Sequence, residues 1–355
     1  MSVTMRDVAR LAGVSVATVS RVLNASAVVQ TDTRDRVLAV ARDLRFAPNG
    51  AARSLITQRT HALGVILPDL HGEFFSELLR GMDRTAQRHG HHLLVSSSHH
   101  EPEGLAIAVR AMRGHVDGLL VMAPDIPLAT LVELLPGGSP TVLLNCGELP
   151  AGVHPDVRVI GVDNHGGARA MTRHLLALGH RRIGFIAGAA HNFDAAERER
   201  GHRDELAAAG LAPDDRLHVR GAFTESGGWR AATTLMKLAE PPSAIFCAND
   251  AMAIGALSAL RGAAITVPDE VAVVGFDDIP VAQFLYPALT SVRVGIAALG
   301  ERSASLLLHS LGEGPSATGA APREVLPTAL VIRGSCGSRP HPALGKEPVL
   351  ELLHS

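Results

Sequence analysis

Cysteine, lysine and the larger aromatic residues are scarce in this chain of 355 residues. The three cysteines, at positions 146, 247 and 336, form an odd and widely spaced set, which argues against a disulfide framework or a zinc site. Lysine occurs only at positions 237 and 346, so arginine supplies nearly all of the positive charge. With a single Trp and a single Tyr, aromatic stacking on a ligand would fall to phenylalanine.

The sequence also lacks the features that define several classes of protein. No stretch approaches the roughly 18 apolar residues of a membrane span, and Asp7 and Arg10 stand where a secretion signal needs an apolar run. The motifs G-x-G-x-x-G, GxxxxGK[ST], G-x-S-x-G and H-E-x-x-H are all absent. We therefore expect a cytoplasmic protein that is not an enzyme, does not bind membranes and needs no cofactor or metal.

Two histidine-rich runs could suggest a metal site, at residues 89–92 and 99–100. They lie at a predicted helix-to-strand turn and just past a predicted strand, and their spacing matches no common metal-ligand pattern. We interpret them as solvated surface histidines.

Charge is distributed unevenly along a chain that is otherwise typical of an ordered protein, with 46% hydrophobic and 19% charged residues. Residues 1–60 contain nine Arg against four Asp, a net charge of +5, whereas the whole chain carries −2 and the remainder therefore −7. The length predicts two or three domains. A small basic segment on an acidic body is the charge layout of a nucleic-acid reader.

Residues Thr4 to Asn24 predict two short amphipathic helices joined by a tight turn, the form of a helix-turn-helix. Gly13 permits the turn, and Ser15 is placed to cap the second helix. The predicted core stripes are Met5, Val8, Ala9 and Ala12, then Val19, Val22 and Leu23, closed by Val37, Val40, Ala41 and Leu44 of a third helix. The alternative is a helical cap on an enzyme, which the basic charge of the segment disfavours.

A hinge-like stretch follows Phe46 and runs to about residue 60. Pro48 can start a helix, yet only about two turns are available, and isolated helices shorter than about 12–15 residues are marginal in water. We expect this segment to fold only when DNA or protein packs against it.

From about residue 61 short apolar runs alternate with helical periods, which predicts an α/β fold with two doubly wound parallel-sheet lobes. The predicted strands are 63–67, 93–97, 118–122, 141–145, 159–162, 183–187, 244–248 and 271–276. Predicted helices include 74–88, 167–178, 197–209, 228–238 and 251–260.

The break between the two lobes is expected at Val162-Asp163-Asn164. Several predicted strands end in polar residues, and ligands of open parallel sheets bind outside the carboxyl ends of the strands. Two lobes with polar tips predict a hinged small-molecule cleft. Asp277-Asp278 could be an acid-base pair, but adjacent carboxylates at a strand end are more often caps or ligand acceptors.

The chain resembles the lactose/galactose repressor family of bacterial transcription regulators over roughly residues 3–335. The resemblance rests on the strings DVARLAGVSVATVSRVLN, PNGAARSL, VDGLLVM, VDNHGGARAMTRHLLALGHRRIGFIAG, ERERG, IFCANDAMAIGAL, VPDEVAVVGFDD and PALTSVRV. It implies a periplasmic-binding-protein-like body and a transcriptional regulator, expected to be a repressor. As a homodimer it would read a near-palindromic operator in double-stranded DNA, under the control of a small-molecule effector that is expected to be a sugar or sugar derivative.

The resemblance places the base-contacting positions of the second helix at Val16, Ala17 and Arg21. Arg21 suits a bidentate contact to guanine, worth about 1–3 kcal/mol of discrimination. The further DNA-binding candidates are Ser15, Thr18 and Asn24. The family's hinge helix falls on residues 49–56 and its apolar minor-groove wedge on Leu55, which could otherwise be an ordinary core leucine.

The resemblance also places the effector-lining positions at Phe75, Asn145, Asn192, Asp194, Arg198, Phe223, Asn249 and Asp277. Arg198 and Asp277 would grip a polar group of the ligand. The alternative for Arg198 is an i, i+4 ion pair with Asp194 on a helix surface, worth only about 0.3–0.5 kcal/mol.

The predicted domains are a DNA-binding head at 1–46, a hinge at 47–60, a two-lobed body at 61–335 and a tail at 336–355. Lobe 1 is assigned to about 61–161 and 294–322, and lobe 2 to about 162–293 and 323–335. The tail has leucines but no sustained heptads, so a dimer is expected rather than a tetramer.

Two alternative functions were weighed against a DNA-binding regulator. One is the solute-binding protein of a transporter, which lacks such a basic head, and the other is a sugar-converting enzyme with an accessory helical domain.

Overall fold

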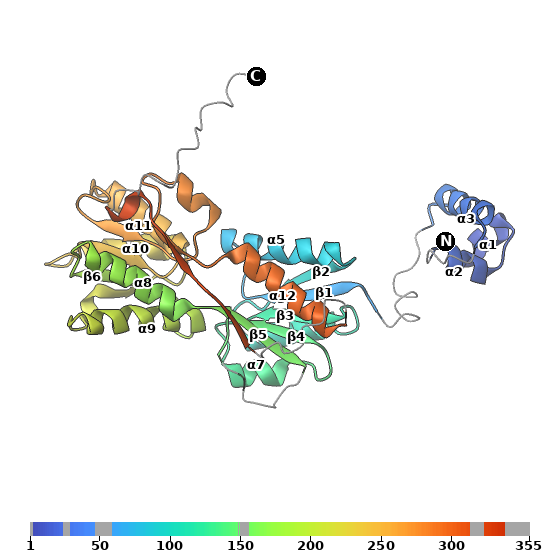
Figure 1. Cartoon of the computed structure of the whole chain (residues 1–355), viewed down its shortest axis with the longest axis horizontal. Coiled ribbons are helices and arrows are strands. Elements are labelled where there is room, and N and C mark those ends of the chain that lie inside the picture. The colour runs from blue at the N-terminus through green and yellow to red at the C-terminus, as the bar shows by residue number, and fades with distance from the viewer. Residues whose placement is uncertain are drawn as a thin grey trace, which may run out of the picture. The chain divides into compact units, whose positions relative to one another are not determined.

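The computed structural model describes residues 3–23, 29–46, 59–147, 149, 156–312 and 323–337. Two compact units divide the chain, the head at 1–60 and the body at 61–355 (Figure 1). Across the described residues, no helix combines the length and the apolar character that crossing a membrane requires.

The head is built from the three predicted helices, α1 (Met5–Ala12), α2 (Val16–Leu23) and α3 (Thr31–Asp43). The predicted stripes do form its core, although the outermost members are only half-buried. The fully buried members are Val8, Ala9, Ala12, Val19, Val22, Val37 and Ala41.

The turn between α1 and α2 is organised by the two residues that the sequence analysis assigned to it. Gly13 adopts a φ of 63°, in the left-handed region where a side chain would cause strain. Ser15 Oγ accepts a hydrogen bond from the backbone N–H of Thr18 at 3.1 Å, which satisfies one free N–H at the start of α2. The predicted cap is therefore confirmed.

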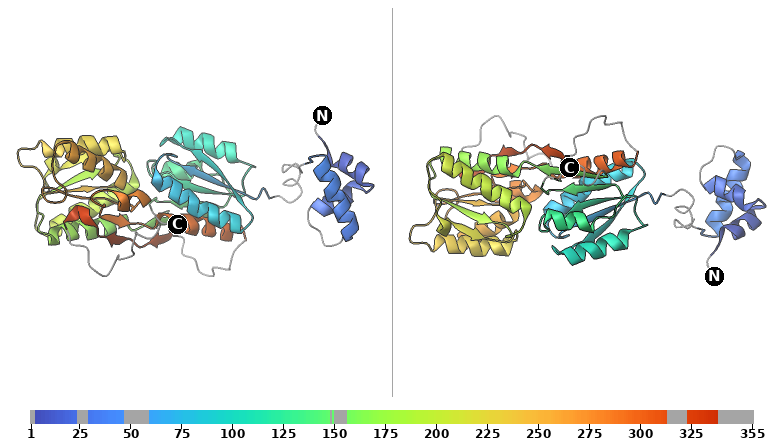
Figure 2. Two further views of the ribbon diagram at one scale, coloured as in Figure 1. Left: turned by 90° about the horizontal axis from the view of Figure 1, so that it is seen from above. Right: turned by 90° about the horizontal axis from the view of Figure 1, so that it is seen from below.

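Lobe 1 of the body is a six-stranded parallel sheet in the order β11-β5-β4-β3-β1-β2. Its strands are β1 (Ala62–Leu67), β2 (His92–Ser97), β3 (Gly118–Met122), β4 (Thr141–Leu144), β5 (Val157–Val162) and β11 (Arg323–Leu326). Helices α5 (Glu73–Arg88) and α12 (Ile296–Ser310) cover one face, and α6 (Pro102–Met112) and α7 (Leu128–Leu134) cover the other (Figure 2). At Gly81 a Cβ would lie 2.0 Å from the carbonyl oxygen of Ala297, so glycine is what lets α5 and α12 approach so closely.

Lobe 2 is a four-stranded parallel sheet in the order β7-β6-β8-β9. Its strands are β6 (Ile183–Ala187), β7 (His218–Arg220), β8 (Ala244–Cys247) and β9 (Ala272–Val274). Its helices are α8 (Asn164–Ala177) and α9 (Phe193–Ala208) on one face, with α10 (Glu225–Met236) and α11 (Asp250–Gly262) on the other. Three short 3-10 turns complete the described elements, η1 (Asp215–Leu217), η2 (Pro280–Phe284) and η3 (Gly334–Cys336).

The chain passes between the lobes after β5, where the break was expected, and twice more near the C-terminus. A short antiparallel ribbon of β10 (Ser291–Arg293) and β12 (Ala329–Val331) accompanies the later passages. The assignment of residues 323–326 to lobe 2 was wrong. They form β11, which pairs in parallel with β5 from Arg323 opposite Val159 to Leu326 opposite Val162, because the outer edge of β5 offers unpaired backbone groups.

All eight predicted strands are present, but the helices of lobe 2 begin earlier than predicted. In each case a polar side chain caps the helix ahead of the apolar pattern and accepts a backbone N–H. These caps are Asp163 before α8, Asn192 before α9, Thr224 before α10 and Asn249 before α11.

One histidine prediction was wrong. His91 is only 1% exposed, and its Nε2 lies 3.6 Å from Asp117 Oδ2, so it is a core residue of lobe 1 rather than a solvated one. Its neighbours His89 and His92, like His99 and His100, are exposed as expected. His91 escaped detection because a single buried position inside a polar run leaves no periodic signal.

Candidate DNA-reading surface and ligand cleft

The outward surface of α2 consists of the residues that the sequence analysis assigned to base contacts. Val16 is 43% exposed, and Ala17 and Arg21 are exposed one helical turn apart. Ser15 and Thr18, also predicted DNA contacts, hold the start of the helix, with their hydroxyl oxygens 2.9 Å apart. Asn24 and Leu55 lie outside the described residues.

Not every arginine of the head is available to DNA. Arg36 Nε donates a hydrogen bond to the carbonyl oxygen of Ala12 at 2.9 Å, which ties α3 to the end of α1. Arg10 lies 3.2 Å from Asp7 on the surface of α1. Arg21 is exposed and is not among the arginines tied down in this way, which suits a contact made outside the head.

The body contains a cleft of about 420 Å³ between its lobes, within the usual size range of small-molecule sites. Lobe 1 contributes the loops that follow β1 and β3 and the start of α5. Lobe 2 contributes the starts of α9, α10 and α11 together with residues 277–281. The walls are thus the carboxyl ends of parallel strands, as the position of the polar strand ends predicted.

Seven of the eight predicted effector-lining residues lie on this cleft. They are Phe75, Asn192, Asp194, Arg198, Phe223, Asn249 and Asp277. Asn145 is not part of the lining. It is 2% exposed, and its Nδ2 donates to Asp194 Oδ2 at 3.0 Å, so it positions a lining residue instead.

Arg198 is held by several groups at the floor of the cleft. Its Nη2 lies 3.0 Å from Asp277 Oδ1, its Nε donates to Asn164 Oδ1 at 2.8 Å, and its Nη1 donates to the carbonyl oxygen of Ala248 at 2.6 Å. The guanidinium also stacks 3.9 Å from the ring centre of Phe276. Arg198 is therefore paired with Asp277 and not with Asp194, which removes the helix-surface alternative.

The contact between Arg198 and Asp277 is a buried ion pair. Although the two atoms are close, Asp277 Oδ1 is buried without a well-aligned hydrogen bond. Burial raises the pKa of Asp277 to about 6, while the Arg198 charge opposes the rise. Asp277 is thus a buried carboxylate in the lining of the cleft, and Arg198 is its charged partner.

Asp194 joins the two lobes at the rear of the cleft. Its Oδ2 accepts from Asn145 at the end of β4, and its Oδ1 accepts from Asn164 Nδ2 at 2.7 Å. Burial raises the pKa of Asp194 to about 6, against the lowering effects of Arg198 and the two amides. Asp194 remains mostly ionised at neutral pH.

Asp278 does not act together with Asp277. Its carboxylate is paired with Arg293 at 2.7 Å and with Arg333 at 2.7 Å, away from the cleft. Asp250, fully buried behind it, accepts from Ser291 Oγ at 2.6 Å and from the backbone N–H of Ile279 at 2.9 Å. Asp277 and Asp278 therefore have separate roles: Asp278 is structural, and Asp277 lines the cleft.

Among the described residues, three further hydrogen bonds join the lobes, in addition to the one from Asn145 to Asp194. Glu73 Oε2 accepts from the backbone N–H of Val281 at 2.9 Å. Asn192 Nδ2 donates to Asp125 Oδ1 at 2.9 Å, and the next residue, Phe193, donates its N–H to the carbonyl oxygen of Pro124 at 2.8 Å. Lobe closure is thus fixed by contacts that a ligand can strengthen or replace.

The sequence analysis missed several polar lining residues, namely His71, Glu73, His100, Asp125, Thr224 and Glu225. Asp125 lies three residues beyond the end of β3, so the strand-end rule could have found it. His100 was placed on the surface, yet its exposed ring reaches the cleft and lies 2.7 Å from Asp125. Glu225 was missed because the sequence analysis predicted this helix to begin at residue 228, whereas α10 begins at Glu225.

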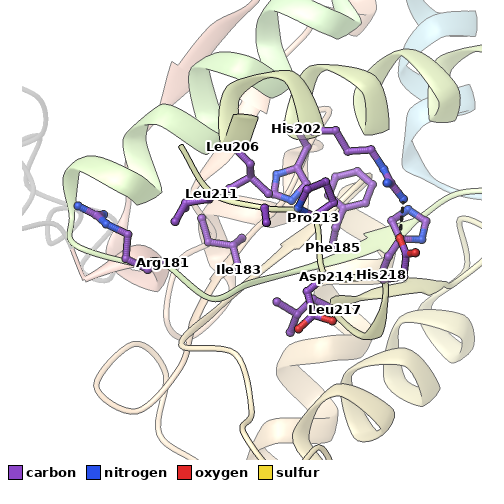
Figure 3. A pocket seen from close by; sticks show the side chains of 13 residues that line it. Arg181, Ile183, Phe185, His202, Leu206, Leu211, Pro213, Asp214, Leu217 and His218 are labelled. Carbon is purple, nitrogen blue, oxygen red and sulfur yellow. Dashed lines mark ion pairs between the residues drawn. The ribbon is translucent and has the colours of Figure 1, made fainter. Parts of the chain in front are cut away.

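A second hollow, of about 50 Å³, lies inside lobe 2 (Figure 3). The rings of His202 and His218 both lie nearly parallel to Phe185 there, at centroid distances of 4.8 and 5.7 Å. Burial lowers the pKa of His202 to about 3, so its ring is a neutral packing element. This space is far smaller than the roughly 300 Å³ at the lower end of small-molecule sites and is too small for an effector.

Within the ranges that the structure describes, no group of three or more His, Cys, Asp and Glu side chains is placed to hold a metal ion. The three cysteines are buried and form no disulfide with one another, and burial raises the pKa of Cys146 to about 12. The thiols of Cys146 and Cys247, whose pKa values burial raises, are therefore protonated at neutral pH.

Both the head and the body match models of known protein domains. Residues 4–49 match the model for bacterial regulatory proteins of the lacI family, and residues 172–336 match that for a periplasmic binding protein-like domain. The HTH-type transcriptional regulator GalR of Salmonella typhimurium strain SL1344 is 37% identical over 317 residues, covering 88% of this chain and 91% of that protein.

Two solved structures extend the likeness to three dimensions. A complex of the transcriptional regulator CelR with cellobiose is 34% identical with a TM-score of 0.66, covering 94% of this chain and 99% of that one. The lac repressor dimer bound to operator and the anti-inducer ONPF is 27% identical with a TM-score of 0.83, covering 95% of this chain and 99% of that one.

Proposed function

The chain belongs to the lacI family of bacterial regulatory proteins, and we propose that a carbohydrate bound in its cleft sets the affinity of its head for operator DNA. It is a DNA-binding transcriptional regulator controlled by a small molecule, and not an enzyme. The observation that carries the proposal is the coexistence of an exposed reading helix in a basic head with a polar cleft in the body.

On DNA, α2 lies in the major groove. Arg21 makes the base-specific contact, while Val16 and Ala17 contribute shape and methyl contacts. Residues 47–60 act as a hinge whose Leu55 enters the minor groove. Opening a base step costs a few kcal/mol, which the additional contact surface of the bent DNA offsets.

The cleft suits a carbohydrate for two reasons. Carboxylates and side-chain amides line it, and these groups accept and donate the hydrogen bonds that sugar hydroxyls require. Phe75 and Phe223 supply apolar rings against which the faces of a sugar ring can pack. Cellobiose in the related CelR complex is consistent with this choice.

The regulator acts as a homodimer, as in the related lac repressor dimer bound to operator. The free edge of lobe 1 supports this arrangement, since β2 is the last strand of its sheet and leaves Leu94 and Val95 each 42% exposed. Apolar side chains on an unpaired edge strand favour association with a partner. Two heads would then read the two halves of a near-palindromic operator in the cytoplasm, where the DNA is.

Ligand binding is linked to DNA binding through lobe closure. A ligand that strengthens or replaces the bonds across the cleft changes the spacing of the two hinges in the dimer, and thereby decides whether both hinge segments fold on DNA. Such coupling typically amounts to about 1–3 kcal/mol, or 5- to 150-fold in affinity. Both an inducer and a corepressor fit this mechanism.

The proposal is tested by selecting operator fragments from genomic DNA with the full-length protein, with and without a panel of carbohydrates. A specific complex whose affinity responds to a carbohydrate supports it. Lack of any specific complex at physiological salt contradicts the reading role, and consumption of a sugar at a useful rate would favour the enzyme alternative.

A further inference from the structure

The charges that face the cleft are strongly one-sided. Six carboxylate residues line it, namely Asp69, Glu73, Asp125, Asp194, Glu225 and Asp277. Against them stands a single guanidinium, Arg198, with His71 and His100 as the remaining titratable groups. Among the described lining residues there is no lysine and no second arginine.

The single guanidinium of the lining already has partners within the protein. Arg198 is 3% exposed and is held by Asp277, Asn164 and the carbonyl oxygen of Ala248. Of the two histidines, His100 is paired with Asp125 at 2.7 Å. A phosphate or carboxylate in the cleft would therefore meet no uncompensated guanidinium and no ammonium group, although such anions are normally recognised by arginine or lysine.

Helix starts are the other common anion site, and here a side chain of the protein already occupies one N–H group of each start. The starts of α9, α10 and α11 converge on the cleft, where free N–H groups would attract an anion. Instead, Asn192 accepts from Ala195 N–H at 3.0 Å, Thr224 from Gly227 N–H at 3.0 Å and Asn249 from Met252 N–H at 2.9 Å.

Each of these capped helices also has an acidic residue in its first turn. Asp194 lies in α9, Glu225 in α10 and Asp250 in α11. The carboxylates of Asp194 and Glu225 face the cleft, so the favourable end of the helix dipole is neutralised before any ligand arrives.

On the basis of the proposed carbohydrate-sensing function, we propose that the cleft selects an uncharged or amine-bearing carbohydrate and rejects phosphorylated and carboxylated ones. Hydroxyl and ammonium groups donate hydrogen bonds, and the six carboxylate residues of the lining supply an excess of acceptors. An anion placed among these carboxylates would suffer like-charge repulsion in a site partly shielded from water.

The test compares matched carbohydrates that differ in one substituent, which changes their charge. The full-length protein is titrated at pH 7.5 with galactose, glucose and cellobiose, and then with galactosamine, glucosamine, galacturonate, and galactose and glucose 6-phosphates. Binding is followed by calorimetry and by the thermal unfolding midpoint. We expect at least one uncharged or amine-bearing probe to bind, with its anionic counterpart at least tenfold weaker.

The outcomes separate the two proposals. A phosphorylated or carboxylated probe that binds more tightly than its neutral parent overturns the charge selection and leaves carbohydrate sensing intact. If no carbohydrate of any charge binds, the proposed effector class is wrong, and the charge selection falls with it.

Variants then test whether the carboxylates are the cause. Glu225→Gln and Asp125→Asn should each raise the affinity for the anionic counterpart of the bound sugar about three- to tenfold, because one repulsive charge is removed. Asp269→Asn, an exposed substitution outside the cleft of the same lobe, is the matched control and should change nothing. If all three variants bind the anionic sugar with equal affinity, the charge of the lining does not set the selectivity.

Discussion

Arg198 and Asp277 form an ion pair at the wall of the cleft, with Nη2 and Oδ1 3.0 Å apart and side chains only 3% and 6% exposed. The pair joins α9 to the segment after β9, two elements far apart in the sequence. Because both groups are buried, each stabilises the charge of the other, and loss of either leaves an uncompensated charge. The pair therefore serves both the stability of lobe 2 and the chemistry of the cleft.

Arg198→Ala should lower the free energy of unfolding by about 3–5 kcal/mol, as expected when one partner of a buried pair is removed. It should also abolish effector binding. Chemical unfolding and calorimetry measure the two effects. Arg200→Ala, which removes an exposed pair with Glu197 on the same helix, is the control and should cost less than about 0.5 kcal/mol. Similar losses in both variants would contradict a special role for Arg198.

The raised pKa of Asp194 predicts a pH dependence of stability. Its folded pKa of about 6 lies above the ordinary value of 3.8, so between pH 4 and 6 the folded state binds more protons than the unfolded state. This residue therefore contributes a stability that falls as the pH rises through that interval, by about 2–3 kcal/mol in total.

Asp194→Asn should remove this contribution, so the variant should gain stability relative to the original protein as the pH rises from 4 to 6. Unfolding midpoints measured across that interval test it, with the exposed Asp269→Asn variant as reference. If the difference in stability between the variant and the original protein does not vary with pH, the raised pKa does not belong to Asp194.

Arg21→Ala should relax the base preference at one guanine in each half-site and cost about 1–3 kcal/mol on the preferred sequence only. Binding selections with variant and original protein provide the comparison. Arg10→Ala, on the surface of α1, should leave the base preference unchanged. Direct readout by Arg21 is ruled out if the affinity for all DNA sequences falls equally.

Leu55→Gly should weaken operator binding while sparing carbohydrate affinity, because it removes the apolar wedge and further disfavours a helical hinge. Leu55→Met keeps an apolar side chain and should retain most of the DNA affinity. Mobility-shift and calorimetric titrations separate the two properties. Undiminished DNA affinity in the glycine variant would remove the wedge from the mechanism.

Much of the fold could be predicted because buried parallel strands leave continuous apolar runs, as in Gly118–Met122 and Ile183–Ala187. The elements that were missed give weaker signals. β11 reads Arg-Glu-Val-Leu and is half-buried, so its sequence does not reveal that it joins the sheet of lobe 1. Its position depends on the free edge of β5, which only the assembled fold creates.

The site was predicted in outline for a similar reason. Strand-end residues such as Asp277 and Asn249 follow clear apolar runs and do reach the cleft. Asn145 satisfies the same rule but points toward Asp194, since the direction of a side chain at a strand end depends on its partners. The pairing of Arg198 with Asp277 is likewise a tertiary contact that spacing along one helix could not show.

The central claim is that ligand occupancy of the cleft controls the affinity of the head for DNA. The most direct measurement is the affinity of the full-length protein for a selected operator fragment, followed by fluorescence anisotropy while the carbohydrate that binds the cleft is titrated. We predict a change of 5- to 150-fold in operator affinity that Arg198→Ala abolishes. An operator affinity that stays constant as the cleft fills would contradict the account.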